Sequence, residues 1–103
     1  MTHKKQWTIS DILETLTRHW PELQSIGVRK LGLFGSYNRG AANPDSDMDF
    51  LVDLEQTSFD AYMDTKFFLE DLFQCRVDLV PEKNIKPRLR PYILAEVMYV
   101  PGL

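Results

Sequence analysis

The sequence predicts a mixed α/β domain (α/β or α+β) in which helices pack against a small mixed β-sheet. Helical and strand-like apolar patterns alternate along the chain, which favours helices packed on a sheet. The second strand pattern follows the first too closely for a parallel crossover through a full helix, so the sheet should be mixed. With 103 residues the chain can bury one core, and we expect a single domain over residues 1–103.

The first third of the chain predicts one helix and one strand. Thr8 to His19 has apolar residues at helical spacing, and its first residue forms a capping-box pattern with Asp11. Pro21 should end this helix. Val28 to Phe34 has the apolar character of a strand, and Gly35 closes it.

A short helix, a loop and a second strand should follow. Ser36 is suited to cap a helix that runs through Arg39, and residues 41–46 have the composition of a loop. Met48 to Leu54 reads as a strand. Side chains alternate across a strand, so Asp47 and Asp49 should point to one side, opposite the core residues.

The last part of the chain predicts two helices separated by a short strand. Ser58 to Phe73 forms the longer helix, and Arg76 to Val80 forms a strand that Pro81 ends. Tyr92 to Met98 should form a final helix. Pro91 does not prevent this helix, because proline is tolerated in the first turn. Residues 99–100 then return as an edge strand.

Composition restricts the class of protein. Apolar residues make up 44% of the chain and charged residues 26%, which is typical of a folded globular domain. A net charge of −3 argues against broad, non-specific binding of nucleic acid. The lone Cys75 excludes an internal disulfide. No apolar run suits a signal peptide or a membrane span, so we expect a cytoplasmic protein.

Gly35 and Ser36 form a turn that is suited to hold phosphate. Glycine lets the main chain approach a phosphate without a side-chain clash. Ser36 would open a helix whose free N–H groups attract an anion, and its hydroxyl adds a donor. The guanidinium of Arg39 matches phosphate oxygens. Taken alone, the turn also fits an ordinary strand-to-helix connection, and Arg39 fits a surface ion pair.

Asp47 and Asp49 favour a metal site at the start of the second strand. Two carboxylates on one side of a strand repel unless a hard cation lies between them. Asp78 lies in a short apolar strand and would join them if that strand neighbours the second. Two Mg²⁺ ions about 4 Å apart would activate an attacking oxygen, with Asp78 contacting its metal, and stabilise the leaving pyrophosphate. The alternatives are a solvated strand end and an exposed edge position.

A basic cluster precedes the last predicted helix. Its cations are Lys86, Arg88 and Arg90. They suit a triphosphate, an acidic partner surface or RNA. A solvated helix entry is the alternative.

Three motifs together resemble those of the minimal nucleotidyltransferase family, in the DNA polymerase beta-like superfamily. They are Gly35-Ser36-x-x-Arg39-Gly40, Ser46-Asp47-x-Asp49 and Asp78. The resemblance covers about residues 28–100 and implies the polymerase beta-like nucleotidyltransferase fold, a nucleoside triphosphate donor and Mg²⁺ dependence. It also implies that Gly35 and Ser36 hold the triphosphate, that Asp47 and Asp49 hold the metals, and that Asp78 holds the catalytic metal.

The resemblance also implies a partner. Small members of this family are commonly encoded beside a HEPN-type ribonuclease and act as its antitoxin. The implied activity is transfer of AMP from ATP to a tyrosine of that toxin, within a hetero-oligomer and without nucleic acid as a direct partner. Two alternatives stay open: an antitoxin that acts by binding alone, and nucleotide transfer to RNA or to a small molecule.

Overall fold

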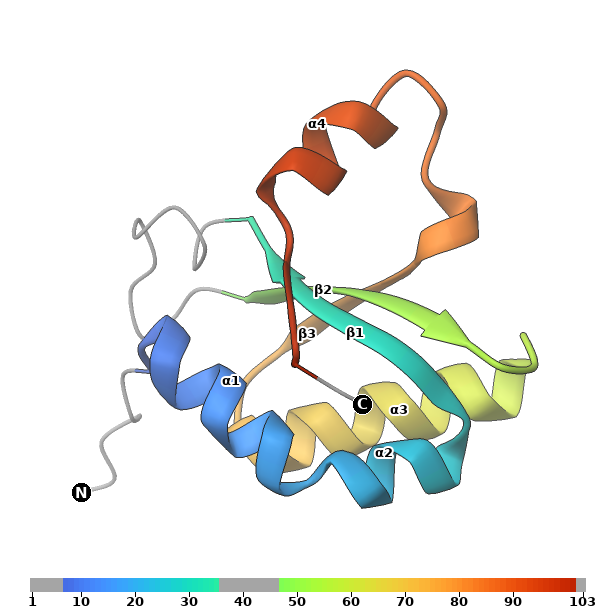
Figure 1. The fold of residues 1–103 in the computed structure, drawn as a ribbon. Helices are drawn as coiled ribbons and strands as arrows, with labels where there is room; N and C mark the ends of the chain where they lie inside the picture. The colour runs from blue at the N-terminus through green and yellow to red at the C-terminus, as the bar shows by residue number, and fades with distance from the viewer. Residues whose placement is uncertain (1–6, 36–46, 102–103) are drawn as a thin grey trace.

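The computed structural model describes residues 7–35 and 47–101 of the chain, which form helices packed on a β-sheet (Figure 1). The elements, in order, are α1 (Ile9–Arg18), α2 (Trp20–Ile26), β1 (Val28–Phe34), β2 (Met48–Leu54), α3 (Phe59–Phe73), β3 (Val77–Pro81), the 3₁₀ helix η1 (Glu82–Asn84), α4 (Arg90–Glu96) and β4 (Met98–Tyr99). None of the helices in these ranges is long and apolar enough to cross a membrane.

The four strands form one mixed sheet in the order β3-β2-β1-β4. β1 pairs antiparallel with both β2 and β4, whereas β2 pairs parallel with β3. The crossover between the two parallel strands runs through α3, as a parallel connection requires. The prediction of a mixed sheet is therefore confirmed.

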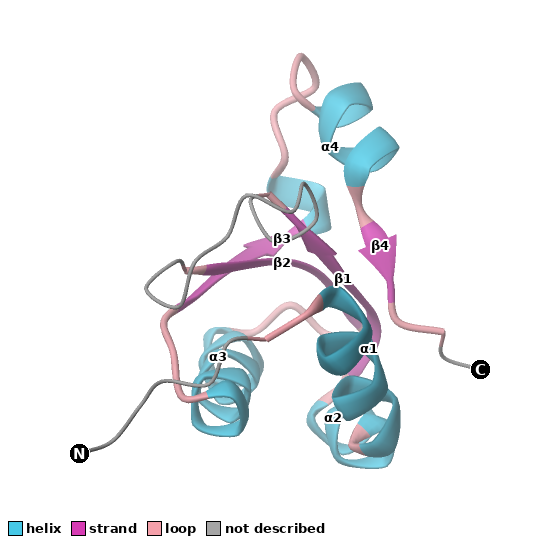
Figure 2. Ribbon diagram, turned by 90° about the vertical axis from the view of Figure 1, so that its left-hand side faces the viewer, coloured by secondary structure: helices cyan, strands magenta, loops and turns pink. Residues whose placement is uncertain are grey.

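Helices α1, α2 and α3 cover one face of the sheet. Figures 1 and 2 show α1, α2 and α3 on one side and α4 on the other. The core lies between the sheet and these three helices, where Ile12, Leu16, Leu31, Phe50 and Leu69 are fully buried. We call the opposite side of the sheet, from which α4 rises, the open face.

Several predicted boundaries are correct. β1 and β2 have the predicted bounds, and the Oγ1 atom of Thr8 caps α1 by accepting a hydrogen bond from the Asp11 N–H at 3.0 Å. Ser58 caps α3 in the same way through the Ala61 N–H. These boundaries depend on residues near in sequence, which explains why local patterns locate them.

The prediction that the first helix stops before Pro21 is correct, because α1 ends at Arg18, but the second helix that follows it at once was not predicted. Pro21 lies in the first turn of α2, where its missing N–H costs nothing and its fixed φ suits a helix. The final helix also begins and ends two residues earlier than expected, at Arg90 and Glu96. The predicted helix from Ser36 to Arg39 and the loop at 41–46 lie outside the described residues.

Gly32 allows β4 and the end of α4 to pack closely on the centre of the sheet. A Cβ atom on Gly32 would lie 2.5 Å from Val97 Cγ2 and 3.1 Å from Tyr99 Cδ1. Valine has a stiff side chain, so it cannot rotate away cheaply. We expect Gly32→Ala to lower the free energy of unfolding by about 1–3 kcal/mol. Urea denaturation measures this, and a variant as stable as the wild type would contradict it.

Candidate functional site

Alternation along β2 separates the core from the open face. Met48, Phe50 and Val52 are buried against the helices, whereas Asp49 and Asp53 are half-buried on the other side, where Leu51 between them is buried as well. This is the period of two that the sequence predicts. It places a carboxylate on the open face near the start of the strand.

The parallel pairing of β2 with β3 brings a second carboxylate to the same place. Asp49 and Asp78 occupy partner positions in the register, so their side chains leave the sheet on the same face. The register begins where the Met48 N–H donates to the Arg76 carbonyl oxygen at 3.0 Å. The condition under which Asp78 would join Asp49, that β3 neighbours β2, is therefore met.

Helix α3 holds β3 in this register through two side chains. The Glu70 Oε2 atom accepts a hydrogen bond from the Val77 N–H at 3.1 Å. The hydroxyl of Tyr62 donates to the Leu79 carbonyl oxygen at 2.7 Å. These contacts lie on either side of Asp78, so they restrict the sliding of β3 that would separate Asp78 from Asp49.

Gly35 lies against the carboxyl group of Asp49. Phe34, the last residue of β1, is the strand partner of Asp49, and the chain then turns at Gly35 with φ = +81°. A Cβ atom at Gly35 would overlap the Oδ2 atom of Asp49 and lie 2.9 Å from its Cγ. Glycine is required here both for the positive φ and for the space that the carboxyl group fills.

The structure says less about the other predicted site residues. Asp47 is exposed and comes one residue before β2, and Asp78 is also exposed. Ser36 and Arg39 lie outside the described residues. Within residues 7–35 and 47–101, no three side chains of metal-binding type form a group that could hold a metal ion. The Asp49–Asp78 pair nevertheless offers the oxygen donors that Mg²⁺ prefers.

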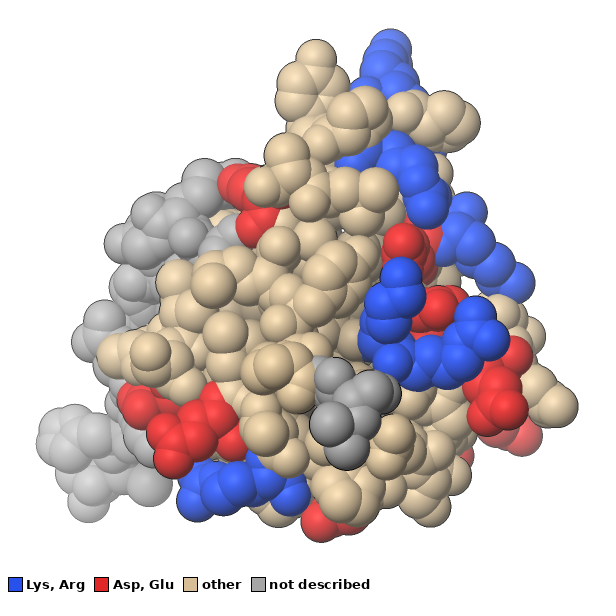
Figure 3. All heavy atoms as spheres, viewed as in Figure 1, with Lys and Arg blue, Asp and Glu red and all other residues tan. Residues whose placement is uncertain are grey.

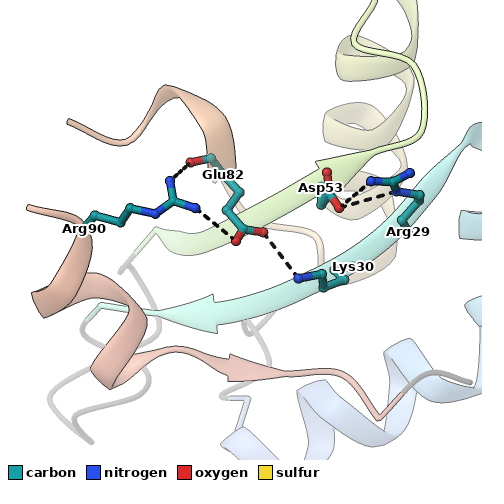
Figure 4. A network of polar contacts seen from close by, with 5 residues as sticks. All are labelled: Arg29, Lys30, Asp53, Glu82 and Arg90. Carbon is teal, nitrogen blue, oxygen red and sulfur yellow. Dashed lines mark hydrogen bonds and ion pairs between the residues drawn. The ribbon is translucent and has the colours of Figure 1, made fainter. Parts of the chain in front are cut away.

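A second polar cluster on the same face was not predicted (Figure 4). The Glu82 carboxylate lies 3.9 Å from Lys30 Nζ and 3.5 Å from Arg90 Nη2, and Arg90 also donates to the Glu82 carbonyl oxygen. Arg29 pairs with Asp53 at 3.3 Å. Glu82 carries no signal in the sequence, because its partners come from β1 and α4 and meet it only in the folded chain.

Tyr99 extends this cluster, with Lys30 Nζ 5.6 Å from the centre of its ring. Burial, and then the negative charge of Glu82, raise the pKa of the Tyr99 hydroxyl above its ordinary value of 10.0. The folded state therefore holds this proton more tightly than the unfolded state. The stability that Tyr99 contributes is complete below pH 10 and is lost as pH rises through the raised pKa.

We accordingly expect Tyr99→Phe to reduce the loss of stability at alkaline pH. Thermal unfolding of the two proteins, measured from neutral pH to above pH 10, tests this expectation. The difference in melting temperature between variant and wild type should shift in favour of the variant as pH rises. A difference that does not change with pH would contradict the raised pKa.

Comparison with known proteins assigns the family. The pattern of the nucleotidyltransferase domain matches residues 9–100, which include both the sheet and all its helices. The chain belongs to the nucleotidyltransferase domain family. The open face at Gly35, Asp49 and Asp78 is thus the candidate site of a nucleotidyltransferase.

Relatives of similar length share this domain. A protein adenylyltransferase, MntA of Thermococcus cleftensis, is 43% identical to this nucleotidyltransferase chain over 95 residues, covering 90% of the chain and 96% of the relative. A solved structure of a protein proposed to be a minimal nucleotidyltransferase superposes with a TM-score of 0.68 at 37% identity, covering 84% of this chain and 93% of that one.

More distant solved structures show the same fold. One is a toxin–antitoxin structure with AMP-PNP, with a TM-score of 0.64, 22% identity, and coverage of 89% of this chain and 71% of that chain. Another is the tri-AMPylated HEPN toxin of Shewanella oneidensis in complex with its MNT antitoxin, with a TM-score of 0.61, 18% identity and coverage of 88% and 73%.

Proposed function

We propose that this chain is a protein adenylyltransferase that transfers AMP from ATP to a tyrosine of a HEPN-type ribonuclease toxin and thereby acts as its antitoxin. The observation that carries the proposal is the pairing of Asp49 with Asp78 on the open face, beside the glycine turn at Gly35. The 43% identity to a protein adenylyltransferase supports the same reaction. The solved complexes with AMP-PNP and with an AMPylated toxin support the donor and the partner.

Each proposed site residue has a role in this reaction. Gly35 would offer its main-chain N–H to the triphosphate, while the space that its missing side chain leaves holds the Asp49 carboxyl group. Ser36 and Arg39 would donate hydrogen bonds to the triphosphate. Asp47, Asp49 and Asp78 would hold two Mg²⁺ ions. When bound, these ions supply charge stabilisation for the transferring phosphoryl group and for the pyrophosphate that leaves.

The chain itself orients the reactants and accepts a proton. The phenol oxygen of the acceptor tyrosine forms a bond to the α-phosphorus, and the bond from that phosphorus to the pyrophosphate oxygen breaks. The acceptor's hydroxyl proton passes to the exposed carboxylate of Asp78. Because Asp49 is half-buried and packed against Gly35, the β1–β2 end of the site is held in place before substrate binds.

Incubation with ATP labelled at the α-phosphate, Mg²⁺ and a cognate HEPN-type toxin tests the proposal. Label should appear on a tyrosine of the toxin, survive treatment with ribonuclease, and disappear when Mg²⁺ is chelated. Label confined to RNA or to a small molecule would show a different acceptor. An unlabelled toxin that is nonetheless neutralised would show an antitoxin that acts by binding alone.

A further inference from the structure

Helix α4 is an apolar helix with little cover from the rest of the described chain. None of its residues is buried, although Tyr92, Ile93 and Leu94 follow one another in it. A helix of seven residues has little stability of its own in water and usually depends on packing. Tyr92 is 74% exposed and Leu89, which precedes the helix, is 46% exposed.

These two exposed residues share one side of the helix. Leu89 and Tyr92 are three residues apart, and the Ile93 N–H donates to the Leu89 carbonyl oxygen at 3.1 Å, so the helical turn includes both. An aromatic and an aliphatic side chain presented together form the kind of anchor that inserts into a pocket of a protein partner.

Cations are concentrated on the N-terminal side of α4, close in the chain to this apolar pair. Residues 83–96 contain four cations, Lys83, Lys86, Arg88 and Arg90, and one acidic residue, Glu96, whereas the whole chain carries −3. Arg90 is paired with Glu82. Figure 3 shows Lys and Arg side chains over the loop between η1 and α4, next to uncharged surface over α4 itself. This concentration of charge favours a partner with an acidic surface.

The segment is also held in position before any partner binds. Glu82, whose side chain is only 16% exposed, accepts from Arg90 at the start of α4 and lies near Lys30 of β1. These contacts fasten α4 to the open face (Figures 2 and 4). Strand alternation and the pairing of Asp49 with Asp78 place both carboxylates on the same face. A surface that is ordered in advance loses less entropy when it binds.

From these observations we propose that residues 83–96, the docking arm, bind the acceptor protein. The acceptor presents an acidic surface to the cations of the arm, beside an apolar pocket that takes Leu89 and Tyr92. The proposal rests on the proposed function, because it names the surface by which the toxin is recognised. A protein fits better than RNA, since the arm exposes two large apolar side chains, Leu89 and Tyr92, whereas RNA would pair with the cations alone.

Binding of the HEPN-type toxin in the absence of ATP tests the docking arm. The double variant Leu89→Ala, Tyr92→Ala should weaken the Kd at least tenfold, as loss of an anchor does. Phe59→Ala, which removes an equally exposed aromatic from the start of α3, is the matched control and should change the Kd less than about twofold. Equal binding by the double variant and the wild type would overturn the proposal.

Charge reversal gives a second, independent measurement. Arg88→Glu should slow association with the toxin and reduce its dependence on salt, whereas Arg18→Glu at the end of α1 should not. Both positions are exposed, so folding is not at risk. If the arm variants lose affinity for an RNA oligonucleotide but keep their affinity for the toxin, the choice of a protein partner is wrong.

The test separates the docking arm from the catalytic proposal. Toxin binding is measured without ATP, so it does not depend on AMP transfer. If the wild type binds the toxin through the arm but never labels it, the docking arm stands and the proposed reaction fails. If label is transferred equally by wild type and arm variants, and the Kd is unchanged, the reaction stands and the docking arm fails.

Discussion

Replacement of Asp47 and Asp49 together by asparagine is expected to lower AMP transfer to the toxin by about a thousandfold or more. Asparagine keeps the shape of aspartate but removes the negative charge that would hold Mg²⁺ on the open face. Loss of metal assistance removes several kcal/mol of transition-state stabilisation, and each 1.36 kcal/mol is a tenfold change in rate. Initial rates with α-labelled ATP measure the loss.

Asp53→Asn is the matched control for this double variant. Asp53 lies on the same strand and the same face as Asp49, with similar burial, but its carboxylate pairs with Arg29. An ion pair that is open to solvent on the Arg29 side contributes about 1 kcal/mol, and it touches neither Asp49 nor Asp78, so Asp53→Asn should keep most of the activity. Equal labelling of the toxin by the wild type and the Asp47, Asp49 double variant would show that the metal assignment is wrong.

The same double variant also distinguishes catalysis from binding. If it still suppresses the toxin when mixed at a stoichiometric ratio, association alone neutralises the toxin under those conditions. If suppression requires the active chain and ATP at substoichiometric amounts, the modification carries the effect. The docking arm lies in different residues, so the variant should bind the toxin with an unchanged Kd.

Gly35→Ala is expected to reduce AMP transfer by about a hundredfold and to destabilise the fold by about 1–2 kcal/mol. The new methyl group would overlap the Asp49 carboxyl group, which must then move. Displacement of a catalytic group by about 1 Å costs on the order of a hundredfold in rate. The loss of stability follows from the positive φ of +81°, which an L-residue with a side chain adopts only with strain.

Gly27→Ala separates these two effects. Gly27 also has a positive φ, of +114°, but a Cβ atom there would have no neighbour within 4 Å. It ends α2, away from the carboxylates. Both variants should therefore unfold at lower urea concentration, whereas only Gly35→Ala should lose activity when both are assayed well below their unfolding transitions. Comparable activity of the two would contradict the role assigned to the Gly35–Asp49 contact.

Much of the scaffold of the site is visible in the sequence. The bounds of β1 and β2 follow from their apolar patterns, and the alternation along β2 places Asp49 opposite Phe50. The cap at Thr8, predicted from its spacing to Asp11, depends on a single side chain that bonds within three residues. Each of these features depends on neighbours in the chain, so local physical rules suffice to predict it.

The second helix and the final helix show where local rules fail. Pro21 is compatible with the end of one helix and with the first turn of the next, and the pattern around it does not distinguish these. Packing decides between them, because Trp20 and Leu23 of α2 are buried in the core. No residue of α4 is buried. The helix therefore has no core-facing side, and the spacing of its apolar residues does not indicate where it begins and ends.

The sequence by itself determined the kinds of group at the site: a glycine turn after one strand, aspartates at the start of the next, and a further aspartate in a later strand. Only the tertiary structure decided that Asp78 is the partner of Asp49, that the Asp49 carboxyl group fills the space beside Gly35, and that Glu82 fastens α4 to the open face. The reason is that strand register and contacts between distant elements depend on backbone hydrogen bonds and packing across the whole sheet, which no local pattern contains.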